Sequence, residues 1–266
     1  MQRFLAVLEY DGTAFHGSQV QGRGRTVQGE LESALARLDG RPVRAILAGR
    51  TDRGVHASGQ VAAFDLRRTM SGQEVANALC ALLPGDVSVR EAAPAPDGFH
   101  PRFWAEARRY RYRILQRPRR SAIWERFSHQ VPYRLDVSGM RAAARNLVGR
   151  HDFRCFGRAP QGNHTVRTVT RLELECCGEH LAIVVEADAF LRRMVRRLVG
   201  TLLDVGRGRT SVEQAGLLVD GGPECAGIGP AVPAKGLTFE GVAYDRGRLG
   251  LGTGCWWSCD PLVPAH

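Results

Sequence analysis

The sequence predicts an α+β fold of two consecutive halves, each with the element order β-α-β-β-α-β, joined into a continuous, mostly antiparallel sheet with helices on one face and a central basic cleft. Apolar runs of strand length alternate with segments of helical periodicity, and the same order occurs twice along the chain. A proline-rich connector over residues 94–101 separates the two copies. Because 266 residues suffice for two separate cores, we expect domains over residues 1–100 and 101–266.

The first half opens with a strand and a loop rich in glycine and glutamine. Thr26 is a favoured N-cap residue, and the apolar residues after it recur with the period of a helix that ends at Gly40. Ser71 and Glu74 have the spacing of a capping box, which predicts a second helix that Pro84 ends. The four expected strands of this half cover residues 4–10, 43–48, 60–66 and 87–93.

The second half repeats this order after the connector. Its expected strands cover residues 105–116, 167–176, 181–187 and 237–244, and its expected helices cover residues 136–148 and 190–205. A short extra helix is expected at 212–219. Only the order of elements is shared between the halves, because their residues show no repeat.

The charge of the chain indicates a nucleic-acid partner. The formal net charge is +10, and Lys235 is the one lysine among the cationic residues, the rest being arginines. A guanidinium group donates two hydrogen bonds to one phosphate and stacks on bases. A GC-rich genome also favours arginine over lysine, so the prediction depends on the charge itself. No signal peptide or apolar run of membrane-spanning length is present, so we expect a soluble, cytoplasmic protein without membrane contact.

Seven cysteines are present, and none of them forms a Cys-x-x-Cys motif. Cys255 and Cys259 lie near Asp260 and His266, but this spacing is too weak a signal for a zinc site. We therefore expect free thiols in a reducing cytoplasm and no bound metal.

The segment 49–57, Gly-Arg-Thr-Asp-Arg-Gly-Val-His-Ala, is predicted to form a loop between two strands with Asp52 at its tip. Arg50 and Arg53 flank the carboxylate and favour its ionised form. The glycines of the segment allow a tight turn and the close approach of a substrate. A solvated surface turn uses the same residue types, so the composition of the loop leaves both interpretations open.

Two arginine-rich segments of the second half are further candidates. In the predicted strand over 107–113, Tyr110 and Tyr112 share one face and arginines occupy the other. A tyrosine on a cleft wall offers a stacking surface for an unstacked base, whereas a pair of core tyrosines fits the same pattern. The predicted helix in 190–200 places arginines, among them Arg196, at the margins of an apolar stripe.

The contiguous stretch 48–57 resembles the signature of the tRNA pseudouridine synthase A family, whose nucleophilic aspartate falls on Asp52. The resemblance implies the pseudouridine synthase fold, built of two RRM-like or ferredoxin-like halves. It also implies that Tyr110 packs on the target base and that Arg196, in the Phe-Leu-x-x-Met-Val-Arg element, pairs with Asp52. Arg50 is expected to orient the loop.

Further stretches resemble family segments that contact RNA. We expect RNA contacts from Phe99, His100, Arg102, Phe103, Arg158 and His164. Interdomain packing is the alternative for the aromatic residues of the connector. The sequence departs from the family at Ser18, where a tryptophan is expected, and in the loop at about 160–164, where a basic residue is common.

The resemblance implies isomerisation of uridine at positions 38, 39 and/or 40 of tRNA, in the anticodon arm, by a homodimer without metal or cofactor. The uridine must leave the base stack for this reaction. Asp52 could add to uracil C6, attack ribose C1′ or remove the C2′ proton, and the sequence leaves these roles open. Two alternatives are a non-catalytic RNA-binding protein of two RRM-like halves, although the RRM aromatic signature is absent, and a nucleoside hydrolase.

Overall fold

The computed structural model describes residues 1–159, 162–220, 225, 227–245 and 249. The chain divides into two compact units. The first contains Met1–Arg108 and the segment from Thr238 onward, and the second contains Arg109–Leu237. The last strand thus belongs with the first unit, whereas the sequence placed it in the second half.

The strands of the first unit follow the order β4-β1-β3-β10, and β2 pairs with β3. Their bounds are β1 Gln2–Tyr10, β2 Ile46–Leu47, β3 His56–Leu66, β4 Val87–Pro94 and β10 Leu237–Tyr244. β1 is antiparallel to both β3 and β4, with Phe4 opposite Phe64, and β10 runs parallel to β3. The rings of Phe4 and Phe64 stack with centroids 6.2 Å apart and are fully buried. This aromatic pair lies in the core of the unit.

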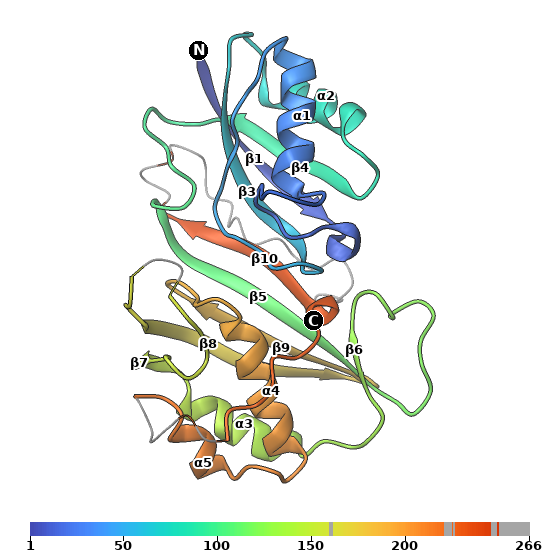
Figure 1. The fold of residues 1–266 in the computed structure, drawn as a ribbon, viewed down its shortest axis with the longest axis vertical. Helices are drawn as coiled ribbons and strands as arrows, with labels where there is room; N and C mark the ends of the chain where they lie inside the picture. The colour runs from blue at the N-terminus through green and yellow to red at the C-terminus, as the bar shows by residue number, and fades with distance from the viewer. Residues whose placement is uncertain (160–161, 221–224, 226, 246–248, 250–266) are drawn as a thin grey trace. The chain divides into compact units, whose positions relative to one another are not determined.

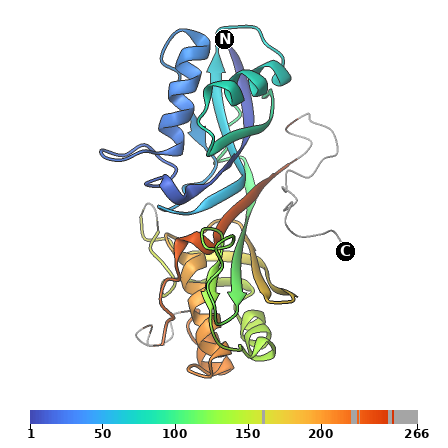
Figure 2. The same ribbon diagram turned by 90° about the vertical axis from the view of Figure 1, so that its right-hand side faces the viewer.

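Two helices accompany these strands, α1 (Val27–Asp39) and α2 (Gly72–Leu82), and they contact each other beside the strands (Figures 1 and 2). Their predicted caps are confirmed. Thr26 accepts a hydrogen bond from the Gly29 N–H, and Ser71 forms the capping box with Glu74. Gly40 ends α1 with φ 73°, in the left-handed region that favours glycine.

The strands of the second unit follow the order β5-β9-β8-β7, and β6 pairs in parallel with β5. Their bounds are β5 Ala105–Gln116, β6 His129–Val131, β7 Gly149–Asp152, β8 Val166–Cys177 and β9 His180–Ala187. The helices α3 (Val137–Asn146), α4 (Met194–Gly206) and α5 (Val212–Gly216) contact one another and lie against the strands (Figure 1). Leu198 and Leu202 of α4 are fully buried and contribute to the core of this unit.

The α+β class and the mostly antiparallel pairing are confirmed, and several element bounds need correction. β2 contains only Ile46–Leu47, and β3 starts at His56, before the predicted residue 60. Gly59 lies within β3, and this position requires glycine because a Cβ there would lie 2.1 Å from the Glu240 carbonyl oxygen. The helix predicted from residue 190 starts at Met194, since Arg193 has φ 65° and cannot continue a right-handed helix. The short strands β6 and β7 were not predicted.

None of the helices in the described part of the chain combines the length and the apolar character that crossing a membrane requires.

Candidate active site

Asp52 lies in the loop between β2 and β3 of the first unit and is half-buried, whereas Arg50 is exposed. The backbone turns tightly after Asp52, because the Val55 N–H donates to the Asp52 carbonyl at 3.1 Å. Gly54 has φ 78° in this turn, a conformation that favours glycine. The prediction of a loop between two strands is therefore confirmed.

The residue before Asp52 is held from two directions. The Ser18 N–H donates to the Thr51 carbonyl at 3.1 Å, and the Thr51 N–H donates to Ser18 Oγ at 2.9 Å. Thr51 Oγ1 lies 2.9 Å from the hydroxyl oxygen of Tyr10 on β1. All three residues are buried, and burial raises the pKa of Tyr10 to about 12. The Tyr10 hydroxyl therefore stays protonated at neutral pH and remains a hydrogen-bonding partner.

The two ends of the loop are also fixed. Gln60 of β3 accepts a hydrogen bond from the Gly49 N–H at 3.2 Å and donates to the Gly49 carbonyl at 2.8 Å. At the other end, the Gly12 N–H donates to His56 Nδ1 at 3.0 Å. Gly12 must lack a side chain, since a Cβ would lie 2.0 Å from the Val55 carbonyl oxygen. Side chains and backbone outside the loop thus determine the path of the chain on both sides of Asp52.

Tyr110 lies on β5 in the second unit and is buried. Its ring packs edge-on against Phe190, with centroids 5.0 Å apart and an interplanar angle of 86°. Tyr112 is fully buried and donates its hydroxyl to the Pro233 carbonyl at 2.9 Å, and burial raises its pKa. Tyr112 is therefore a core residue. Tyr110 is also largely buried, so its role as a stacking surface stays a prediction.

The arginines that alternate with these tyrosines are partly neutralised within the second unit. Arg109 pairs with Glu186 at 3.0 Å, and Arg111 pairs with Glu175. Arg111 is itself buried. These two arginines therefore stabilise the sheet. The alternation of arginine and tyrosine in the sequence did not predict their glutamate partners.

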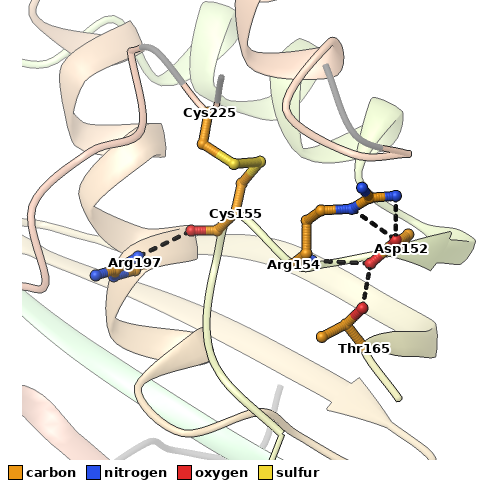
Figure 3. Close-up of a disulfide and its surroundings, with 6 residues drawn as sticks. All are labelled: Asp152, Arg154, Cys155, Thr165, Arg197 and Cys225. Atoms are coloured by element: carbon orange, nitrogen blue, oxygen red, sulfur yellow. Dashed lines mark hydrogen bonds and ion pairs between the residues drawn. A yellow bond between two sulfur atoms is a disulfide. The ribbon is translucent and has the colours of Figure 1, made fainter. Parts of the chain in front are cut away.

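Arg196 lies in the first turns of α4 and is half-buried. Its Nε donates to the Val232 carbonyl at 2.6 Å, and its own carbonyl accepts the Val232 N–H at 3.2 Å. The neighbouring Arg197 donates from Nη1 to the Cys155 carbonyl at 2.9 Å (Figure 3). Each of these two side chains is thus oriented by a backbone carbonyl, whereas the side chains of Arg192 and Arg193 are exposed.

A family model described as tRNA pseudouridine synthase matches residues 6–103 and 143–245. This chain belongs to that family. The tRNA pseudouridine synthase A of Myxococcus xanthus is 43% identical over 249 residues, which cover 93% of this chain and 94% of the relative. The protein of the same name from Geobacter sulfurreducens is 42% identical over 248 residues, covering 92% of this chain and 100% of the relative.

The two matched stretches of the family model contain the three predicted catalytic residues but not the predicted substrate-binding residue. Arg50 and Asp52 lie in the first stretch, and Arg196 lies in the second. Tyr110 falls between the two stretches. The match covers the segments that contain Arg50, Asp52 and Arg196, and the roles of all four residues stay predictions.

The connector after β4 contains both buried and exposed aromatic residues. Phe99 is fully buried and packs edge-on against Trp104 and Tyr244. It has no exposed surface with which to contact RNA, and because both partners lie in the first unit, Phe99 packs within that unit and not between domains. Phe103 is 74% exposed, and its ring stacks on His100 with centroids 4.2 Å apart.

Arg102 completes this cluster, with its guanidinium carbon 5.7 Å from the centroid of the Phe103 ring, and like His100 it is half-buried. His100 Nδ1 accepts the N–H groups of Arg102 and Phe103, a geometry that requires the nitrogen to be unprotonated. Partial burial, together with the charges of Arg102 and Arg3, lowers the pKa of His100. The His100 ring is therefore neutral at neutral pH, and the positive charge of the cluster comes from arginine.

Arg158 and His164 are exposed in the second unit. The Arg158 carbonyl accepts the Arg192 N–H at 2.9 Å, which attaches this segment to the residues before α4. Arg167 Nη1 donates to His164 Nδ1 at 3.0 Å. Residues 160–161 of the predicted RNA-contacting loop lie outside the described residues.

The prediction that all thiols are free is wrong for one pair. Cys155 and Cys225 form a disulfide across a sequence separation of 70 residues (Figure 3). The two cysteines form no recognisable spacing motif, so this disulfide could not be predicted from the sequence. Cys80, Cys176 and Cys177 are free and exposed. Cys255 and Cys259 lie outside the described residues.

Replacing Cys225 with serine is expected to lower the free energy of unfolding by about 4 kcal/mol in oxidising buffer, because the unfolded chain regains the freedom of a long loop. Denaturant unfolding in oxidising and reducing buffer measures this difference. The matched control is Cys177→Ser, which removes an exposed free thiol and should leave stability unchanged. Equal stability of Cys225→Ser and the unmodified protein in oxidising buffer would contradict the disulfide.

Within the described residues, no group of three or more His, Cys, Asp and Glu side chains is arranged to hold a metal ion.

Proposed function

We propose that this protein isomerises uridine to pseudouridine on the 3′ side of the anticodon stem-loop of tRNA, as a cytoplasmic homodimer that needs no metal or organic cofactor. The family match carries the proposal, because the matching model is described as tRNA pseudouridine synthase and covers most of the chain. The names of the relatives support tRNA as the substrate. A net charge of +10 suits a polyanionic partner.

The reaction breaks the bond between ribose C1′ and uracil N1 and forms a bond between C1′ and C5. The proton on C5 is released to solvent, N1 gains a proton, and no electrons enter or leave. The target uridine must first leave the base stack, which costs roughly a few kcal/mol. The protein must therefore bind RNA, hold an extruded uridine and retain the detached uracil until it has rotated.

Asp52 is the proposed nucleophile or base, acting by addition to uracil C6, attack on C1′ or removal of the C2′ proton. The hydrogen bonds to Thr51 support this role, because a reactive carboxylate must be held in a fixed position. Arg50 is the proposed orienting residue of the loop, and Arg196 is the proposed charge partner of Asp52. Tyr110 confines the detached uracil by stacking.

The proposed RNA contacts come from the members of the predicted set that are exposed or half-buried. Phe103, stacked on His100 and close to Arg102, offers an aromatic surface and a positive charge in one place. Arg158 and His164 add a second exposed segment. Phe99 is left out, because it is buried.

If the Tyr110 hydroxyl takes part in proton transfer, replacing Tyr110 with phenylalanine is expected to slow turnover about 100-fold and to leave tRNA affinity unchanged. Steady-state kinetics and a binding measurement separate the two effects. Tyr112→Phe is the matched control, since it removes a buried hydroxyl that bonds the Pro233 carbonyl and should lower stability without slowing turnover. Near-normal turnover of Tyr110→Phe would reduce Tyr110 to a stacking surface.

Mapping pseudouridine in the tRNA of a strain that lacks the gene tests the proposed substrate. Pseudouridine should disappear at positions on the 3′ side of the anticodon stem-loop and remain elsewhere. The intact gene should restore it, and a gene encoding Asp52→Asn should not. An unchanged modification map would contradict the proposal.

A further inference from the structure

Ser18 is a fully buried residue that lies outside the Asp52 loop, and its N–H, its carbonyl and its Oγ each form a hydrogen bond. Its N–H and Oγ bond the carbonyl and the N–H of Thr51 at 3.1 and 2.9 Å. Its carbonyl accepts the N–H of Gln28 on α1 at 2.9 Å. One residue therefore connects the backbone immediately before Asp52 to a helix.

We infer that Ser18 is a positioning residue for the reaction, which places Asp52 through the backbone of Thr51; the inference rests on the proposed function. The Thr51 carbonyl and the Asp52 N–H belong to one rigid peptide plane. The Thr51 N–H belongs to the plane before it. Because Ser18 holds one group of each plane, it restricts both backbone torsions of Thr51 and thereby places the Cα of Asp52.

The approach of Ser18 to the loop depends on its neighbour. Gly17 has φ 110°, in the left-handed region that side chains disfavour. A Cβ at Gly17 would lie 3.0 Å from the Thr51 carbonyl oxygen, the same atom that accepts the Ser18 N–H. The local backbone is therefore shaped for close contact with Thr51, and the hydroxyl of Ser18 adds the second bond.

Thr51 has a separate attachment through its own side chain. Its Oγ1 lies 2.9 Å from the Tyr10 hydroxyl oxygen, so β1 holds the side chain while Ser18 and α1 hold the backbone. A catalytic group needs to be held within about 0.5 Å by residues that are themselves fixed. Loss of the Ser18 hydroxyl removes the bond to the Thr51 N–H but leaves the bond between Thr51 Oγ1 and Tyr10 in place. The loop is therefore kept, but the peptide before Thr51 is less restrained and Asp52 is held less firmly.

The test is to measure kcat and KM of Ser18→Ala on unmodified tRNA. The wild-type protein and Asp52→Asn are assayed in parallel. We expect kcat to fall about tenfold, as for a modest displacement of a reacting group, and KM to stay within about twofold, because Ser18 is buried and does not reach RNA. Ser18→Cys keeps a side chain of similar shape with a weaker acceptor and should give an intermediate kcat, which retains the test if the alanine variant does not fold.

Ser128→Ala is the matched control. Ser128 is also buried, and its Oγ donates to the Trp124 carbonyl at 2.8 Å in the second unit. Its replacement also removes a buried hydrogen bond between a serine side chain and the backbone, and it should leave kcat unchanged. Unchanged kcat in both Ser18 variants, an equal loss in Ser128→Ala, or a rise in KM without a change in kcat would each overturn the inference. Failure of the wild-type protein to form pseudouridine would instead overturn the proposed function.

Discussion

Replacing Asp52 with asparagine is expected to reduce pseudouridine formation by about 10⁴-fold or more, while the protein stays folded and binds tRNA with similar affinity. Asparagine keeps the shape of the side chain but is neither a nucleophile nor a base of useful strength. The carboxylate is half-buried, and many other residues supply the positive charge that attracts RNA. Single-turnover assays and a tRNA-binding measurement on the same preparation test the expectation.

Asp65→Asn is the matched control for this variant. Asp65 lies in the same unit and forms an ion pair with Arg3 at 2.8 Å, which lowers its pKa. The same chemical change there should reduce stability slightly and leave activity intact. Substantial activity in Asp52→Asn, with Asp65→Asn also active, would remove Asp52 from the mechanism.

Replacing Arg196 with methionine is expected to lower kcat by roughly 100-fold to 1000-fold, the usual effect of removing one charge-stabilising donor from an active site. Methionine keeps most of the side-chain stem and removes the charge. Arg196→Lys should recover only part of the activity, because an ammonium group cannot reproduce the planar set of donors. Measuring kcat for the two variants tests both expectations.

Arg197→Met provides the control on the same helix. Its guanidinium group donates to the Cys155 carbonyl, so its loss should lower stability and leave kcat near normal (Figure 3). Equal losses of activity in the two methionine variants would show that Arg196 acts through the folding of α4. The pair thereby separates a role in the reaction from a role in structure.

Features encoded by neighbouring residues were predicted well from the sequence. β5 was predicted with its observed bounds, Ala105–Gln116, because a long β-rich segment follows a proline-rich connector. The capping box of α2 was predicted because Ser71 and Glu74 lie three residues apart and bond each other directly. The Asp52 loop was also predicted, because the residues that indicate it are contiguous in the sequence.

Features that depend on distant residues were missed. The sequence marked Ser18 only as a departure from the family, whereas the structure shows it bonded to Thr51, 33 positions away. The Cys155–Cys225 disulfide connects segments with no common pattern. The start of α4 was placed too early, because helical periodicity continues through Arg193 and does not reveal its left-handed backbone.

If the protein isomerises uridine within tRNA, it must release tritium from unmodified tRNA labelled at uracil C5, because forming the new bond at C5 expels the label. We expect tritium in water, uracil retained in the polymer, and loss of both tritium release and pseudouridine in Asp52→Asn. Binding of tRNA without release of tritium, or the appearance of free uracil, would contradict this expectation.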